Sequence, residues 1–231
     1  MVSIADLNWM QVEAYLERDD RVVLPVGSTE QHAYLSLATD TILARRLALE
    51  AAEPLGIPVL PAMPFGVAGR WAAFPGTIAL GVDTLEAVLV DALDSLAVHG
   101  FRRFLLLNGH GGNEPVAEHL EAWASSREDV LLRFHSWWTG PRTTAALAEL
   151  EPEPAHASWM ENFPWTRLAG VALPEEPKPF VRDGIDELEP EAVRELVGDG
   201  SCGGPYARSD EEMARVRAVA VAEIRDLLEF S

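Results

Sequence analysis

One turn-rich stretch near the N-terminus carries the side chain types that bind divalent metal ions. Glu30, His32 and Asp40 follow the apolar run 22–26 and precede a helical pattern over residues 41–52. On extended backbone, residues two apart point to the same side, so Glu30 and His32 lie together, and Asp40 can return to them after a short loop. Two carboxylates and an imidazole suit one or two divalent cations such as zinc, manganese or iron. The alternative is a polar loop that ends in an N-capping aspartate.

A glycine-rich loop, Asn108-Gly109-His110-Gly111-Gly112-Asn113, is the second candidate. It directly follows the strand-like segment 101–107, so His110 is expected to project from a strand end. Glycines at 111 and 112 permit a ligand to approach the backbone closely. The loop fails the dinucleotide-binding fingerprint, because Glu114 stands where that pattern needs a third glycine. A histidine that only caps or packs remains the alternative for His110 taken alone.

His156 and Glu161 form the third candidate, together with the aromatic residues that surround the motifs. The two are five residues apart, so they do not share a face of a regular helix, although both can border one cavity from a helix start. The alternative is a surface helix with an exposed carboxylate. We expect Trp71, Trp138 and Trp159 to stack on a planar or cyclic substrate. Core packing is the alternative for at least half of the aromatic group, which comprises Trp71, Trp137, Trp138, Trp159, Phe163 and Trp165.

The segments that must position these residues alternate between strand-like and helical patterns. This alternation predicts an α/β fold with a mainly parallel sheet in three layers. In open α/β sheets, sites are built at the carboxyl edge of the strands, which is where the first two motifs begin. No segment resembles a long linker, so one domain over residues 1–231 is expected. The predicted strands are 21–26, 57–60, 77–80, 101–107 and 130–134, and the predicted helices are 3–18, 40–53, 83–99, 114–126 and 208–229.

Composition excludes several classes of function. The formal net charge of −19, from 37 acidic and 18 basic residues, repels phosphate backbones and argues against nucleic-acid binding. No run of 18 apolar residues is present, which excludes an ordinary transmembrane helix, and residues 1–20 do not resemble a signal peptide. The single cysteine, Cys202, rules out an intrachain disulfide framework and has no identified partner base. These features together predict a cytoplasmic protein with no membrane partner.

Four motifs, taken in order, resemble the creatininase (creatinine amidohydrolase) family. They are Gly27-Ser28-Thr29-Glu30-Gln31-His32 with Thr39-Asp40, then Phe74-Pro75-Gly76-Thr77, the loop Asn108 to Asn113, and His156-Ala157 with Glu161. The resemblance covers roughly residues 20–165 and a helical C-terminus. It implies a three-layer α/β/α fold, a binuclear metal centre and a homo-oligomer, commonly a hexamer.

The resemblance also implies which residues hold the two metals. Glu30, Asp40 and His110 correspond to the ligands of one metal. His32, the bridging Asp40 and Glu161 correspond to those of the second. We expect two divalent ions of zinc, manganese or iron.

This sequence departs from the family pattern at several places. Creatininase has a glutamate ligand two residues after the motif histidine, where this chain has Gly112. The segment 32–40 is one residue shorter than usual and lacks a second histidine. A histidine common three residues before the Phe-Pro-Gly-Thr motif is replaced by Trp71. The usual His-Ala-Gly-Glu-x-Glu-Thr reads His-Ala-Ser-Trp-Met-Glu-Asn here. We interpret these changes as retained hydrolysis with an altered substrate.

The resulting hypothesis is hydrolysis of a C–N bond in a small, cyclic or planar amide by a metal-activated water. His156 matches the family's catalytic histidine and is expected to protonate the departing nitrogen, with Glu161 beside it. Backbone amides at Gly111 and Gly112 are expected to help hold the oxyanion. One alternative is a peptidase of the type that matures mycofactocin. Another is a protein that binds a metal or small molecule without catalysis.

Overall fold

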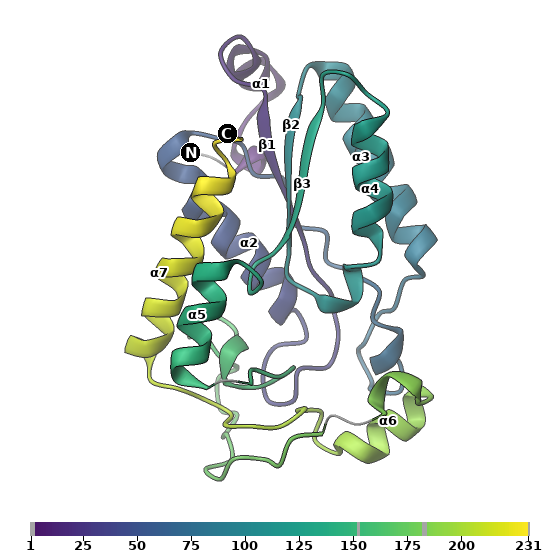
Figure 1. Cartoon of the computed structure of the whole chain (residues 1–231), viewed down its shortest axis with the longest axis vertical. Helices are drawn as coiled ribbons and strands as arrows, with labels where there is room; N and C mark the ends of the chain where they lie inside the picture. The colour runs from purple at the N-terminus through teal and green to yellow at the C-terminus, as the bar shows by residue number, and fades with distance from the viewer. Residues whose placement is uncertain (1–2, 152, 182–183, 231) are drawn as a thin grey trace.

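A parallel sheet forms the centre of the computed structural model, which describes residues 3–151, 153–181 and 184–230. Within these residues the sheet has three strands in the order β1-β2-β3, namely β1 (Arg21–Val26), β2 (Arg103–Asn108) and β3 (Leu131–Ser136). The register pairs Val26 with Asn108 and Asn108 with Ser136, so all three strands end at one edge. That edge faces the lower end of the molecule in Figure 1.

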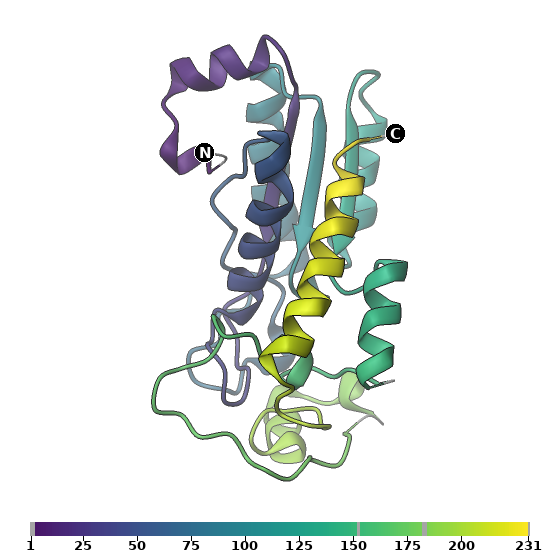
Figure 2. The ribbon, with the colours of Figure 1, turned by 90° about the vertical axis from the view of Figure 1, so that its left-hand side faces the viewer.

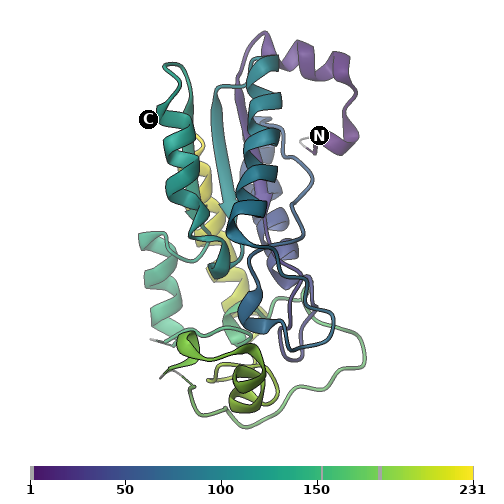
Figure 3. The same cartoon turned by 90° about the vertical axis from the view of Figure 1, so that its right-hand side faces the viewer.

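Helices cover both faces of the sheet (Figures 2 and 3). Successive residues of β1 alternate between the two sides, so Val23 packs into one hydrophobic cluster while Val22 and Leu24 pack into the other. The prediction of a three-layer α/β/α sandwich is therefore confirmed. One layer contains α2 (Thr39–Ala52), α5 (Pro141–Leu150) and α7 (Asp210–Leu227), and the other contains α3 (Val82–His99) and α4 (Val116–Ser125).

A buried carboxylate on α7 fixes the start of α5. Glu223 accepts hydrogen bonds from the backbone N–H of Arg142 at 3.0 Å and of Thr143 at 2.9 Å, and from the Thr143 hydroxyl at 2.7 Å. Burial alone would raise the pKa of Glu223, but the hydrogen bonds from Thr143 and Arg142 outweigh it and lower the pKa. The carboxylate thus satisfies the free amides of the first turn of α5.

Replacing Glu223 with alanine is expected to lower the free energy of unfolding by roughly 2–3 kcal/mol, because two backbone donors lose a charged acceptor. Since the folded pKa is lowered, this contribution is fully present above the ordinary carboxyl pKa and is lost as the pH falls from there through the lowered folded pKa of Glu223. Urea denaturation at pH 7 and at a series of pH values below the ordinary carboxyl pKa measures both effects. Asp226→Ala is the control, because the Asp226 carboxylate lies in an exposed ion pair with Arg142 and its loss should cost less than about 1 kcal/mol. Equal losses for the two variants would contradict this role of Glu223.

Three predicted elements differ from the structure. The opening helix is shorter than 3–18: a 3₁₀ turn (Ile4–Asp6) precedes α1 (Trp9–Leu16), which begins where Asn8 and Gln11 form a reciprocal capping box. The predicted strands 57–60 and 77–80 are isolated bridges instead. Val59 pairs with Val23 beside β1, but prolines in this part of the chain interrupt a regular ladder.

The segment from residue 140 to α7 is the least predictable part of the chain, because its many prolines obscure helical periodicity. The structure places α5 and α6 (Pro190–Val197) there, and each begins with proline at its first position, which helices tolerate. The connecting segment passes below the carboxyl edge of the sheet, next to α6 (Figures 1 and 2). Trp71 packs with Ile185 and with Val193 of α6, so this end of the molecule is covered. No helix among the described residues has the length and apolar character to cross a membrane.

Candidate metal centre

Five side chains of the predicted site meet at the carboxyl edge of the sheet. Glu30 and His32 come from the loop after β1, Asp40 from the first turn of α2, and His110 from the loop after β2. Glu161 reaches the same place from a 3₁₀ helix (Trp159–Glu161) in the segment after α5. All five are buried, and none exposes more than 6% of its surface. Ionisable groups are rarely buried this deeply unless they pair or bind a cation.

Asp40 is shared between two groups of three ligand atoms. Its Oδ1 lies 2.9 Å from His32 Nε2, and its Oδ2 lies 3.1 Å from His110 Nδ1. Glu30 Oε1 completes the first group at 3.3 Å from His110 Nδ1, and Glu161 Oε2 completes the second at 3.7 Å from His32 Nε2. Within each group, the ligand atoms lie within 4.8 Å of one another, as a common ion requires.

The polar atoms that face this centre have only one another as hydrogen-bonding partners within the described residues. Glu30 Oε1, His32 Nε2 and Asp40 Oδ2 are buried and form no hydrogen bond outside the close histidine–carboxylate pairs of the centre. Burying charged groups together is costly unless they are paired or bind a cation. Carboxylate oxygens and imidazole nitrogens are the ligands of zinc, manganese and iron sites, so the donor set fits such cations.

Backbone carbonyls orient both histidines. His32 Nδ1 lies 3.3 Å from the carbonyl oxygen of Glu30, and His110 Nε2 lies 3.0 Å from that of Val67. A carbonyl only accepts, so each of these nitrogens donates its hydrogen. When the rings are neutral, the lone pairs of His32 Nε2 and His110 Nδ1 therefore face the carboxylates. This arrangement is typical of histidines that bind metals.

The raised pKa values of the two histidines show that the carboxylates of the centre attract positive charge. Burial would lower the pKa of His110, but the carboxylates of Asp40 and Glu30 outweigh it and raise the pKa to about 10. Burial likewise opposes the charge on His32, yet Asp40 and Glu161 raise its pKa well above the usual range. The pKa of Glu30 is raised, chiefly by burial. The carboxylates thus hold protons on the histidines in the absence of any other cation.

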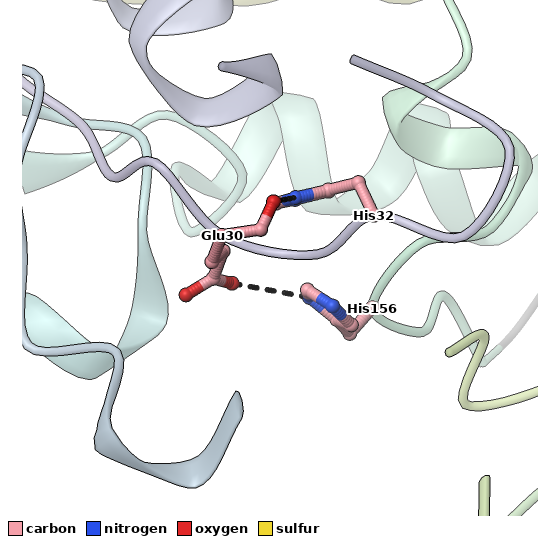
Figure 4. Close-up of side chains that lie close together, drawn as sticks. All are labelled: Glu30, His32 and His156. Atoms are coloured by element: carbon pink, nitrogen blue, oxygen red, sulfur yellow. Dashed lines mark hydrogen bonds and ion pairs between the residues drawn. The ribbon is translucent and has the colours of Figure 1, made fainter. Parts of the chain in front are cut away.

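His156 lies beside Glu30 at the edge of the centre (Figure 4). It belongs to neither group around Asp40. Its Nδ1 lies 3.7 Å from Glu30 Oε1, and its ring stacks on Trp71 with 4.3 Å between ring centroids. Its Nε2 lies 2.9 Å from the side-chain nitrogen of Gln31 and 3.1 Å from the Gln31 carbonyl oxygen. Burial and the nearby positive charge of His32 hold the pKa of His156 well below its usual value. His156 also forms a third possible ligand group with Glu30 and His32.

A backbone turn brings His156 and Glu161 to the same cavity. Ala157 has a φ of 54°, in the left-handed region that few non-glycine residues occupy. Its N–H donates to Glu161 Oε2 at 2.7 Å, which fixes the carboxylate. The N–H of Cys202 donates to the His156 carbonyl at 3.0 Å, and the Gln31 amide donates to Gly200 at 2.9 Å. The loop around residue 200 therefore supports His156 through both its backbone and its ring.

A cavity of about 1030 Å³ opens onto the centre. Trp71, Trp138, Gly111 and Gly112, which the sequence suggests as substrate contacts, line it. Trp159 does not: it is fully buried in the core beside Trp137 and Phe163, because its side of the 3₁₀ turn packs against the helical layer. The predicted substrate contact at Trp159 is therefore corrected to a core residue.

Sequence reasoning missed the residues that support the site. Gln31 holds His156, the Val67 carbonyl holds His110, and the Asn113 side chain holds the Val67 peptide. Gln31 and Asn113 stand inside the recognised motifs, so their position was a usable signal. Val67 acts through its backbone and leaves no such signal in the sequence.

The sequence profile of the creatininase family, described as creatinine amidohydrolase, matches residues 5–228. The chain belongs to the creatininase family. Solved structures of this family share its fold: a creatinine amidohydrolase (creatininase) superposes with a TM-score of 0.82 and 25% identity over 98% of this chain and 96% of its own. A creatininase of Zn-Zn type also superposes with a TM-score of 0.82, at 24% identity, over 98% of this chain and 96% of its own.

Curated creatininase relatives differ in the substrate that their names state. Creatinine amidohydrolase of Pseudomonas putida is 31% identical over 66% of this chain and 64% of its own length. The mycofactocin precursor peptide peptidase of Mycolicibacterium smegmatis is 41% identical over 40% of each chain. The 3-dehydro-scyllo-inosose hydrolase of Thermotoga maritima is 27% identical over 84% of this chain and 67% of its own. The chain thus spans less than two thirds of the first two relatives, and the relatives name different substrates.

Proposed function

We propose that this protein is a binuclear metal-dependent hydrolase that cleaves a C–N bond in an amide substrate. The observation that carries the proposal is the position of Asp40, whose two carboxylate oxygens face His32 on one side and His110 on the other. A carboxylate placed between two ligand groups is the arrangement that bridges two cations. The creatininase relatives that are named as amide or peptide hydrolases support the choice of reaction.

The proposed ligands follow the two groups described above. Glu30, Asp40 and His110 hold one divalent cation, and His32, Asp40 and Glu161 hold the other, with zinc or manganese as the expected metals. Bound cations of this type supply an acidified water and polarise a carbonyl oxygen.

The remaining groups of the cavity handle protons and hold the substrate. His156 presents Nδ1 to the centre beside Glu30, so we assign it the transfer of a proton to the departing nitrogen. The Trp71 ring stacks on one face of the His156 ring and excludes water from that face. Trp138 and the glycines at 111 and 112 form the wall that we assign to the substrate, whose oxyanion the glycine amides help to hold.

A short peptide is the second candidate substrate. The cavity of about 1030 Å³ lies at the upper end of the range for small-molecule pockets, so its size accommodates either class. The similarity to the mycofactocin peptidase supports a peptide. A homo-oligomer, a hexamer by family resemblance, and a cytoplasmic location remain predictions.

A panel of cyclic amides, formamides and short peptides tests the proposal on metal-loaded protein. We expect turnover of at least one class, a loss of at least about 100-fold after chelation, and recovery when zinc or manganese is restored. The substrate class with the highest kcat/KM decides between an amidase of small molecules and a peptidase. Turnover that survives complete chelation would contradict the metal-dependent reaction. Stably bound metal without turnover of any class would instead support a binding protein.

A further inference from the structure

The first observation concerns the space beside Gly112. A Cβ atom on this residue would lie 2.1 Å from the carbonyl oxygen of Val67 and 2.4 Å from His110 Nε2. These are the two atoms that form the 3.0 Å hydrogen bond orienting His110. The bond therefore occupies the place where any side chain at position 112 would begin. A glutamate, which stands there in creatininase, does not fit this backbone.

The second observation concerns Asn113, whose fully buried side chain holds Val67 in place. Its Oδ1 accepts the Val67 N–H at 3.0 Å. Its Nδ2 donates to the Gly27 carbonyl and to Asn108 Oδ1, both at 3.1 Å. The amide thus ties the Val67 peptide to the ends of β1 and β2, where the candidate ligands begin.

A second close-packed glycine, Gly66, makes the contact between Asn113 and Val67 possible. A Cβ atom on Gly66 would lie 2.5 Å from Asn113 Oδ1, so the chain before Val67 must be glycine to approach the amide. The contact between the Val67 carbonyl and His110 Nε2 therefore depends on two residues without side chains, Gly112 and Gly66. Residues 66 and 67 can pass this close to the Asn113 side chain only because residue 66 has no side chain.

We propose that Asn113 is a positioning residue for the metal centre and acts through Val67. It fixes the Val67 carbonyl, which takes the Nε2 hydrogen of His110, and so keeps the Nδ1 lone pair directed at Asp40 and Glu30. Gly112 contributes to the same positioning, because its lack of a side chain leaves room for the Val67 carbonyl. The proposal rests on the metal centre proposed above. Groups that orient a metal-binding histidine typically contribute 10- to 100-fold in metal affinity.

Zinc affinity, measured by competition with a chromophoric chelator, tests the proposal without a substrate. Asn113→Ala and Gly112→Ala are each expected to weaken zinc binding by about 10- to 100-fold, because they release the same carbonyl from opposite sides. Gly111→Ala is the matched control in the same loop. A Cβ atom there meets only Trp138 Cζ2, at 4.0 Å, so zinc affinity should stay within about twofold of the wild type.

A second readout reports the orientation of the ring itself. Long-range ¹H–¹⁵N spectra of the zinc-loaded wild type should show His110 protonated at Nε2, and this proton should exchange faster in Gly112→Ala. Thermal melts of the metal-free proteins identify a variant that fails to fold. If Asn113→Ala fails, Gly112→Ala decides the question.

The outcomes separate the two proposals. Wild-type zinc affinity in both variants, with a folded protein, would overturn the role of Asn113 and leave the metal centre standing. A wild-type protein that binds no divalent metal would remove the metal centre, and this role with it. An equal loss in Gly111→Ala would show that the loop responds to any added side chain, and would also overturn the proposal.

Discussion

Asp40→Asn is expected to abolish metal binding and turnover together. The amide keeps the shape of the side chain but loses the negative charge that both ligand groups share. Removing an outer partner of a metal ligand already costs 10- to 100-fold in affinity, so loss of a shared ligand should cost at least about 100-fold for each cation. Metal content by mass spectrometry, together with kcat/KM on whichever substrate is turned over, measures both effects on one sample.

Asp226→Asn is the control for this substitution, since Asp226 lies on the surface of α7 and pairs with Arg142. It should retain the metal content and kcat/KM of the wild type. If Asp40→Asn still binds two cations per chain, the bridging role of Asp40 is wrong, whatever happens to the rate.

His156→Ala should separate the rate from metal binding. His156 lies outside both groups around Asp40, so the variant is expected to keep its metal content. A positioned proton donor contributes about 10²- to 10⁴-fold, and kcat should fall by that factor while KM changes little. Pre-steady-state kinetics on metal-loaded protein measures the chemical step directly.

Two results would contradict this role of His156. Unchanged kcat would remove the residue from the mechanism. Loss of one cation would make His156 a ligand, as its group with Glu30 and His32 allows. His119→Ala is the control, because His119 is exposed and pairs with Glu86 away from the cavity.

The layers of the fold and the main site residues were predictable because both follow from local pattern. Continuous apolar runs at 22–26 and 104–107 identify buried parallel strands, and parallel strands end at a common edge. Polar motifs that follow two such strands must therefore meet. The strand ends therefore predict that the two motifs lie close together, and the family resemblance places Asp40 and His110 at one metal; their side chains lie 3.1 Å apart.

The support of the site was not predictable because it depends on contacts between distant segments. The path that brings the Val67 carbonyl to His110 is set by Gly66 and Asn113, which are 47 positions apart in the chain. Trp159 was misplaced because a tryptophan beside a motif has the same local pattern whether it faces a cavity or the core. The helices α5 and α6 were missed because proline can begin a helix as well as end one.

A crystal structure of zinc-loaded protein, with anomalous data collected on both sides of the zinc absorption edge, tests the metal centre most directly. We expect two zinc peaks per chain, one beside Glu30 and His110 and the other beside His32 and Glu161, with Asp40 between them. Absence of both peaks under zinc concentrations that saturate the protein, or zinc bound only away from Asp40, would contradict the account.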